Sequence, residues 1–266
     1  MGFKIKKITA FLLNLFGILD LLLLLEKMKY GRQYIRIINY HDVAKSYAYN
    51  FQRQVLWLKR HYQNINYNTF KGFLDDKNDI EPGPGIILTF DDGLSGNYKY
   101  ARDVLNKLKM TGYFMVSSDL IGTDGHMTEY QLKKLLSEGH VIGCHTSTHH
   151  RMNKDDSYIT LEYEIIQAKK NLEKVFDSPI SIFCWCGGEE YTYTRQAQEM
   201  ILKAGYEYSF MTNSFPVTKS TDRFHIQRIN VEDSWSIALL KFQICGIMDF
   251  RFWRKRERVN RLTQVF

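Results

Sequence analysis

The sequence has little of what marks a disulfide-stapled protein or a structural zinc protein. It contains four cysteines in 266 residues, Cys144, Cys184, Cys186 and Cys245, and none follows another with C-x2-C spacing. A chain of this length can bury a core without disulfides, so we expect reduced thiols in a cytoplasmic setting. A zinc site built from Cys184 and Cys186 is an alternative, although alternate positions on one strand explain the pair more simply.

An internal repeat, a low-complexity tract and a nucleic-acid-binding motif are also missing. The formal net charge is +7, but the positive excess is concentrated at the two ends of the chain. The residues responsible are Lys4, Lys6, Lys7, Arg251, Arg254, Lys255, Arg256, Arg258 and Arg261. Basic ends beside an apolar segment suit an anionic membrane surface better than a nucleic acid, so we expect no nucleic-acid partner.

One long hydrophobic run is present, over residues 8–25, and it is just long enough to span a bilayer. It lacks the small-residue cleavage site of a secretory signal. Asn14 and Asp20 interrupt it, and a charged Asp inside the hydrocarbon would cost roughly 2.5–3.5 kcal/mol. We therefore expect residues 1–30 to form a membrane-embedded or in-plane helix, with a buried packing helix as the alternative.

Beyond residue 30, short apolar segments alternate with amphipathic ones. Strands are predicted at 34–40, 86–90, 113–117, 140–144, 181–185 and 206–212, and helices at 51–62, 98–110, 129–137, 161–176 and 194–204. The repeated order of strand and helix predicts parallel strands, in a barrel or a doubly wound sheet. Hydrophobic residues make up 44% of the chain, which suits a globular domain with a core.

Two polar clusters follow directly after predicted strands. Thr-Phe-Asp-Asp-Gly at 89–93 places the carboxylates of Asp91 and Asp92 side by side, where they repel each other unless a cation lies nearby. His-Thr-Ser-Thr-His at 145–149 carries two histidines four residues apart, which can turn toward one point. Because the carboxyl ends of parallel strands converge on one face, we expect both clusters at one site.

The two clusters together indicate a metal site. Two imidazoles and one carboxylate form a three-ligand set that leaves positions open for water and substrate. Alone, an Asp-Asp-Gly sequence is often a turn and a histidine pair is often exposed to solvent. A two-metal phosphoesterase would need more ligands than these clusters supply.

These clusters resemble the first two motifs of the polysaccharide deacetylase family, also called the NodB-homology or carbohydrate esterase 4 family. The resemblance implies a distorted (β/α) barrel of the NodB-homology type over residues 34–235. It implies Asp91 as the general base, and Asp92, His145 and His149 as ligands of one divalent metal, most simply Zn²⁺. The organisation expected is then an apolar helix at 1–30, this domain, and a basic helical extension at 236–266.

Two further residues enter through the same resemblance. Tyr-His-Asp at 40–42 resembles the exopolysaccharide deacetylase branch, in which the N-terminal side supplies a histidine. That resemblance implies His41 as the general acid; the alternative is a strand-end histidine that only packs. The segment 225–230 resembles the final strand of the family, where Arg228 would steady Asp91 by a charge-assisted hydrogen bond, or form a plain surface ion pair.

The third family motif is altered. Here it reads Phe-Cys-Trp-Cys-Gly-Gly at 183–188, without the usual Pro and Tyr and without an Arg to orient the base. Backbone N–H groups near Gly187 would still hold the oxyanion. The altered motif also supports an alternative of a different class, in which the protein binds carbohydrate but has lost catalysis.

The function expected is metal-dependent hydrolysis of the N-acetyl group of an amino sugar in a polysaccharide or glycoconjugate. The apolar N-terminus and basic C-terminus favour a second possibility, a deacetylase or deformylase of a lipid-linked or lipopolysaccharide sugar. The expected partners are an N-acetylated saccharide or glycolipid and a membrane surface, at the cytoplasmic side of the inner membrane. The sequence leaves the oligomeric state open.

Overall fold

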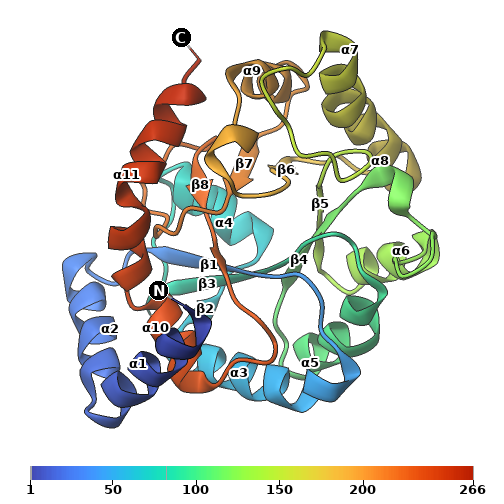
Figure 1. Ribbon diagram of the computed structural model, residues 1–266. Coiled ribbons are helices and arrows are strands. Elements are labelled where there is room, and N and C mark those ends of the chain that lie inside the picture. Colours follow the sequence, from blue (N-terminus) through green and yellow to red (C-terminus); the bar gives the residue numbers. More distant parts are fainter. Residues whose placement is uncertain (1, 82, 266) are drawn as a thin grey trace.

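A single parallel sheet, with nine strands among the residues described, curls into a nearly closed barrel in the computed structural model (Figure 1), which describes residues 2–81 and 83–265. Neighbouring strands pair in the order β8-β7-β6-β5-β4-β3-β1-β9, with β2 beside β3. The strands are β1 Ile35–Tyr40, β2 Gln63–Asn64, β3 Gly85–Phe90, β4 Gly112–Val116, β5 Val141–Cys144, β6 Ile182–Cys184, β7 Tyr208–Met211, β8 Ile226–Gln227 and β9 Ile229–Asn230. The predicted (β/α) barrel is confirmed, and the predicted strands agree with the observed ones to within two residues.

The barrel closes at one residue. β8 pairs with β7 and β9 pairs with β1, so the two ends of the sheet are joined in sequence by Arg228 alone. The backbone N–H of Arg228 donates to the carbonyl of Met211 at 2.8 Å. The expected final strand at 225–230 is therefore split in two, and its middle residue stands at the seam of the barrel.

The strands are apolar on both faces because each face packs against a different layer. One cluster fills the barrel interior, with Ile87, Met115 and Phe210 from the strands and Phe70 from the helix α4 (Tyr67–Leu74). In Figure 1, α4 lies behind the centre of the barrel. The other cluster lies between the strands and the outer helices. The continuous apolar runs in the sequence thus reflect burial on both sides.

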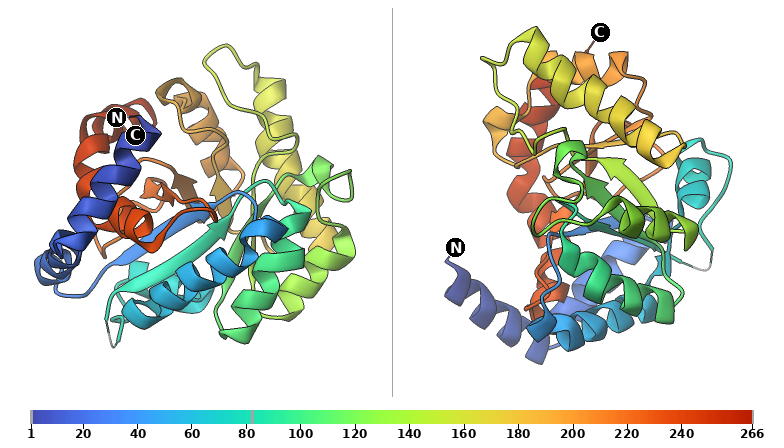
Figure 2. Two further views of the ribbon diagram at one scale, coloured as in Figure 1. Left: turned by 60° about the horizontal axis from the view of Figure 1, so that its bottom comes forward. Right: turned by 90° about the vertical axis from the view of Figure 1, so that its right-hand side faces the viewer.

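Helices surround the barrel in the order expected for alternating strands and helices (Figures 1 and 2). Besides α4, they are α1 Phe3–Leu15, α2 Ile18–Lys29, α3 Ala48–His61, α5 Arg102–Lys107, α6 Glu129–Ser137, α7 Tyr158–Leu161, α8 Ala168–Phe176, α9 Arg195–Lys203, α10 Ile237–Ile244 and α11 Ile247–Leu262. Two predicted helices contain π-helical turns, at Asn97–Ala101 and Glu162–Gln167. The helix α4 is an addition to the predicted pattern.

The single helix predicted at the N-terminus is wrong, because the apolar run forms two helices, α1 and α2. They are bent by 79° at a break where Gly17 adopts a φ of +70°. By length and composition no single helix of the described chain would cross a membrane, and this bent pair meets that test only together. One side of the pair packs on the domain, where Ala10, Leu19 and Leu23 are buried.

A buried ion-pair network fixes both ends of the chain to the barrel. Arg36 of β1 donates to Asp249 of α11 at 2.8 Å and 2.6 Å, and it also pairs with Glu26 of α2. Arg36 is fully buried, so removing either partner would leave an unpaired charge in the interior. The two terminal helices are thereby held beside each other.

One buried histidine outside the site gives a prediction on stability. The Nδ1 of His140 accepts the backbone N–H of Gly112 at 3.1 Å, and its Nε2 faces the Asn106 side-chain oxygen at 3.1 Å, which fits a neutral ring. Burial lowers the pKa of His140 to about 4. The unfolded chain, with a pKa near 6.5, therefore takes up the proton first. This group destabilises the fold progressively as the pH falls from about 6.5 to about 4, by up to about 3 kcal/mol.

We expect His140→Asn to reduce that loss, because an amide oxygen can accept the same N–H and does not titrate. The measurement is the free energy of unfolding in urea at pH 7 and at pH 4.5, for wild type and variant. The exposed His61→Asn serves as the control and should keep the wild-type pH dependence. An unchanged dependence in His140→Asn would show that His140 is protonated in the folded protein.

Candidate active site

The predicted site residues come together at the carboxyl end of the barrel. Asp91 and Asp92 follow β3, His145 follows β5, and His41 follows β1. With His149 they line one cleft of about 490 Å³, whose other lining residues are Asn39, Arg151, Gly187, Gly188, Glu189, Thr212, Asn230, Phe252 and Lys255. A cavity of similar volume, about 510 Å³, lies elsewhere and contains none of the predicted residues. The convergence expected for parallel strands places both motifs in one cleft.

The two motif loops hold backbone conformations that favour glycine. Asp92 has a φ of +68°, Thr146 of +64° and His149 of +65°. Such conformations cost on the order of 1–3 kcal/mol each and persist only where the surroundings fix them. The loops bent in this way carry Asp92, His145 and His149 at one cleft.

Glu164 fixes the histidine loop. Its carboxylate accepts the backbone N–H groups of Ser147 and Thr148, each at 3.0 Å, and the hydroxyl of Thr148 at 2.8 Å. Glu164 is buried in the π-helical turn between α7 and α8. Glu164 could not be predicted from the sequence, since nothing near it distinguishes it from other glutamates on that helix.

Asp92, His145 and His149 face one another. The Oδ1 atom of Asp92 lies 3.3 Å from the Nε2 of His145 and 3.0 Å from the Nε2 of His149. The Nδ1 of His145 lies 2.9 Å from the backbone carbonyl of Cys184 and must donate to it. A neutral His145 then presents a lone pair to the carboxylate, and Asp92 Oδ1 is buried without a hydrogen-bond partner. A cation between these atoms satisfies them, so this donor set fits a divalent metal.

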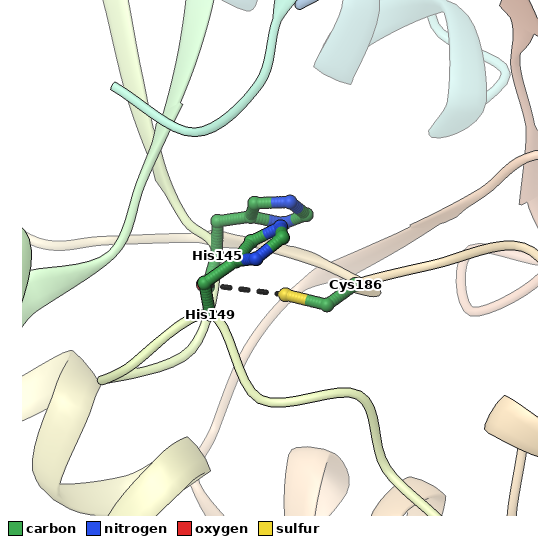
Figure 3. Close-up of side chains that lie close together, drawn as sticks. All are labelled: His145, His149 and Cys186. Carbon is green, nitrogen blue, oxygen red and sulfur yellow. Dashed lines mark hydrogen bonds between the residues drawn. The ribbon is translucent and has the colours of Figure 1, made fainter. Parts of the chain in front are cut away.

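Two buried thiols also lie near these atoms. Possible ligand atoms come within 4.8 Å of one another in two groups, His145 with His149 and Cys186, and Asp91 with His145 and Cys184. Figure 3 shows Cys186 pointing toward the two histidines and donating to the backbone carbonyl of His145, at 3.5 Å. Only Cys184 lies in a strand, so strand alternation does not account for the pair. The two thiols belong to different groups. Asp92 is in neither group, but its Oδ1 lies 3.3 Å and 3.0 Å from the Nε2 atoms of His145 and His149.

Asp91 is buried beside this set and is held by Arg228. The guanidinium donates to both carboxylate oxygens, at 2.6 Å and 2.9 Å, and Asn39 donates to one of them at 2.8 Å. Arg228 is itself buried, so the contact is not a surface ion pair. Burial raises the pKa of Asp91, but the charge and hydrogen bonds of Arg228, together with the nearby His145 and His41, outweigh it and hold the pKa below its usual value. The expected hydrogen bond is confirmed, and it leaves Asp91 ionised.

His41 lies at the rim of the cleft. Its backbone carbonyl accepts the side-chain N–H of Asn97 at 2.7 Å, which fixes the turn after β1. Its half-exposed ring lines the same cleft as Asp91 and Asp92. This position allows contact with a leaving group, while the role of general acid stays a prediction.

The C-terminal helix forms one wall of the cleft. Phe252 and Lys255 of α11 line it, and the ammonium of Lys255 donates to the backbone carbonyl of Gly188 in the altered third motif. Two residues beyond Gly188, Glu190 accepts two hydrogen bonds of 2.8 Å from Arg258, which is also on α11. From the sequence alone, these basic residues are expected only as surface charge. Their contacts with the loop depend on tertiary packing that no local motif signals.

Comparison with known proteins agrees with this arrangement. Residues 79–209 match the model of the polysaccharide deacetylase family. The poly-β-1,6-N-acetyl-D-glucosamine N-deacetylase of Staphylococcus aureus (strain MRSA252) is 24% identical over 251 residues, which is 81% of this chain and 85% of that protein. The segment 79–209 matched by the family model contains both motifs, whereas His41 and Arg228 lie outside it.

Two solved structures share the fold. IcaB from Ammonifex degensii superposes with a TM-score of 0.68 at 18% identity, covering 82% of this chain and 97% of the other. The Streptococcus pyogenes deacetylase PplD, solved with acetate, also gives a TM-score of 0.68 at 18% identity, covering 79% and 98%. At this level of identity the likeness concerns the fold.

Proposed function

Residues 79–209 belong to the polysaccharide deacetylase family, and on this premise we propose that the chain hydrolyses the N-acetyl group of an amino sugar in a polysaccharide, releasing acetate. The observation that carries the proposal is the cleft in which a buried, ionised Asp91 lies beside the Asp92, His145 and His149 set. In a carbohydrate-binding relative without catalysis, the buried pair of Asp91 and Arg228 beside this set would have no function.

Asp92, His145 and His149 would hold the metal, for which Zn²⁺ is our proposal because imidazole and carboxylate ligands suit it. When bound, such a cation polarises a carbonyl and lowers the pKa of its water toward about 7. The hydrogen bond from His145 Nδ1 to the Cys184 carbonyl fixes the tautomer that offers Nε2 to it.

The remaining residues handle protons and charge. Asp91 takes the proton of the attacking water on its carboxylate, and Arg228 keeps that carboxylate ionised and oriented. Gly187 lines the cleft, and backbone N–H groups near it would stabilise the oxyanion. His41 donates a proton to the departing amine, which is too basic to leave as an anion.

For the substrate, we propose an N-acetylglucosamine polymer, since the Staphylococcus aureus relative is named for deacetylating poly-β-1,6-N-acetyl-D-glucosamine. A lipid-linked N-acetylated sugar is the second candidate, favoured by the exposed apolar side chains of α1 and α2. A position at the cytoplasmic side of the inner membrane is part of that second proposal.

The test is acetate release by the metal-loaded full chain from β-1,6- and β-1,4-linked N-acetylglucosamine oligomers and from a lipid-linked N-acetylglucosamine. Release from a β-1,6 oligomer in preference to the others supports the first substrate. Preference for the lipid-linked sugar supports the second. Absence of acetate from all three, with metal bound, would overturn the proposed activity.

Lys255 gives a prediction about the wall of the cleft. Gly187 and Gly188 are adjacent and intrinsically flexible, and Lys255 holds the carbonyl of Gly188. We expect Lys255→Ala to lower kcat about tenfold, because the loop that presents the oxyanion N–H groups loosens. Lys255→Arg should recover most of kcat, and the exposed Arg254→Ala on the same helix should have no effect. A rise in KM with unchanged kcat would instead make Lys255 a substrate-binding residue.

A further inference from the structure

The two N-terminal helices expose an unusually large apolar surface. Twelve large hydrophobic side chains of α1 and α2, or of the break between them, are exposed in the part of the chain described. They are Phe3, Ile5, Ile8, Phe11, Leu12, Leu15, Phe16, Ile18, Leu21, Leu24, Leu25 and Met28. Single exposed hydrophobic residues need no explanation, but a contiguous patch of this kind marks an interaction surface.

The patch continues onto the C-terminal helix. A groove of about 390 Å³ between α2 and α11 has Leu22 and Leu25 on one side and Phe250 and Trp253 on the other. Phe250 is 80% exposed and Trp253 is 46% exposed. We call the twelve residues above, together with Phe250 and Trp253, the terminal face. Figure 1 shows α1, α2 and α11 on one side of the barrel, away from α6 and α7.

Most charges around the terminal face are positive; the exposed Glu257 of α11, which accepts a hydrogen bond from Trp253, is an acidic exception. Exposed basic side chains on the same three helices include Lys4, Lys7, Lys29, Arg251 and Arg254. The two acidic residues of α1 and α2 are already paired, Asp20 with Lys241 at 2.8 Å and Glu26 with the buried Arg36. An apolar surface bordered mainly by basic groups is complementary to an anionic lipid headgroup layer.

We propose that the terminal face docks on the surface of an anionic lipid bilayer, with α1 and α2 lying in the plane of the interface. The 79° bend and the packing of both helices on α10 hold them against the body of the protein. In that geometry the exposed apolar side chains enter the boundary between headgroups and acyl chains, while the basic groups contact the headgroups.

Docking would bring the cleft close to the bilayer. Phe252 and Lys255 line the cleft from α11, while Phe250 and Trp253 of the same helix belong to the terminal face. One helix therefore separates the two surfaces, and a glycan at the membrane surface would be within reach. This consequence rests on the proposed function; the docking itself does not.

The experiment measures sedimentation of the full chain with vesicles of phosphatidylcholine, with and without phosphatidylglycerol. We expect binding that requires phosphatidylglycerol and weakens at high salt. Phe11→Ser with Leu15→Ser removes two side chains that are 60% and 63% exposed, and it should weaken binding at least about tenfold. Arg251→Glu with Arg254→Glu should weaken binding to the anionic vesicles selectively.

Matched controls lie on the far side of the barrel. Tyr130→Ser with Ile159→Ser removes side chains that are 74% and 76% exposed, and should leave vesicle binding unchanged. His149→Ala should also bind vesicles normally, which separates docking from catalysis. Equal binding by wild type and Phe11→Ser with Leu15→Ser would overturn the proposal. A dimer that forms without lipid and is dissociated by the same substitutions would also overturn it. So would wild-type protein that stays bound to vesicles in both high salt and alkaline carbonate.

Discussion

Asp91→Asn is expected to lower kcat by at least about a thousandfold while the metal content stays at the wild-type level. A positioned general base contributes on the order of 10²–10⁴ in rate, and an amide in the same place accepts no proton. The substitution is nearly isosteric, so the cleft should keep its shape. The measurements are initial rates of acetate release, and metal per chain by elemental analysis of the purified variant.

Two controls make this result specific. The exposed Asp103→Asn on α5 removes one negative charge away from the cleft and should leave kcat unchanged. The unfolding midpoint of Asp91→Asn should be recorded as well, because Arg228 is buried and would lose its charged partner. Wild-type turnover in Asp91→Asn would exclude it as the base. Loss of metal together with turnover would place Asp91 among the ligands, in the group it forms with His145 and Cys184.

The core of the site could be predicted because its residues are close in sequence to strand ends. Asp91 and Asp92 directly follow β3, and His145 directly follows β5. In a parallel sheet those ends converge whatever the details of the helices. Apolar runs located the strands to within two residues, so the two motifs could be placed in one cleft before any geometry was known.

The supporting contacts could not be located in the same way, because they join distant parts of the chain. Arg228 and Asp91 are separated by 137 positions, and their contact requires the barrel to close at the seam between β8 and β9. A resemblance suggested that pair, but only the fold shows that Arg228 is buried. Glu164 and Lys255 belong to helices whose sequences look like ordinary amphipathic surface.

At the N-terminus the prediction is wrong for a local reason. Hydrophobicity predicts one helix, but Gly17 lies within the run and adopts a positive φ, which glycine does more easily than other residues. The break there divides the run into α1 and α2. The hydrophobicity of the segment shows how apolar it is, but it does not predict which of its residues pack on the domain.

His149→Ala should remove both metal and activity. In a three-ligand site each ligand is needed, and even partners that only orient a ligand alter metal affinity or activity by 10–100-fold. We therefore expect the dissociation constant for Zn²⁺ to rise by at least about a hundredfold. It is measured by competition with a chromophoric chelator at fixed pH.

The neighbouring residues provide the controls that decide the ligand set. His150 is adjacent in sequence, but its Nε2 lies 3.0 Å from Asp156, so His150→Ala should keep wild-type affinity. Cys186→Ser tests the thiol that lies within 4.8 Å of both histidines. If Asp92 completes the set, Cys186→Ser leaves affinity unchanged and Asp92→Ala abolishes binding. If instead Cys186→Ser abolishes binding and Asp92→Ala does not, the third ligand is the Cys186 thiolate and not the Asp92 carboxylate. The altered third motif would then be part of the metal site.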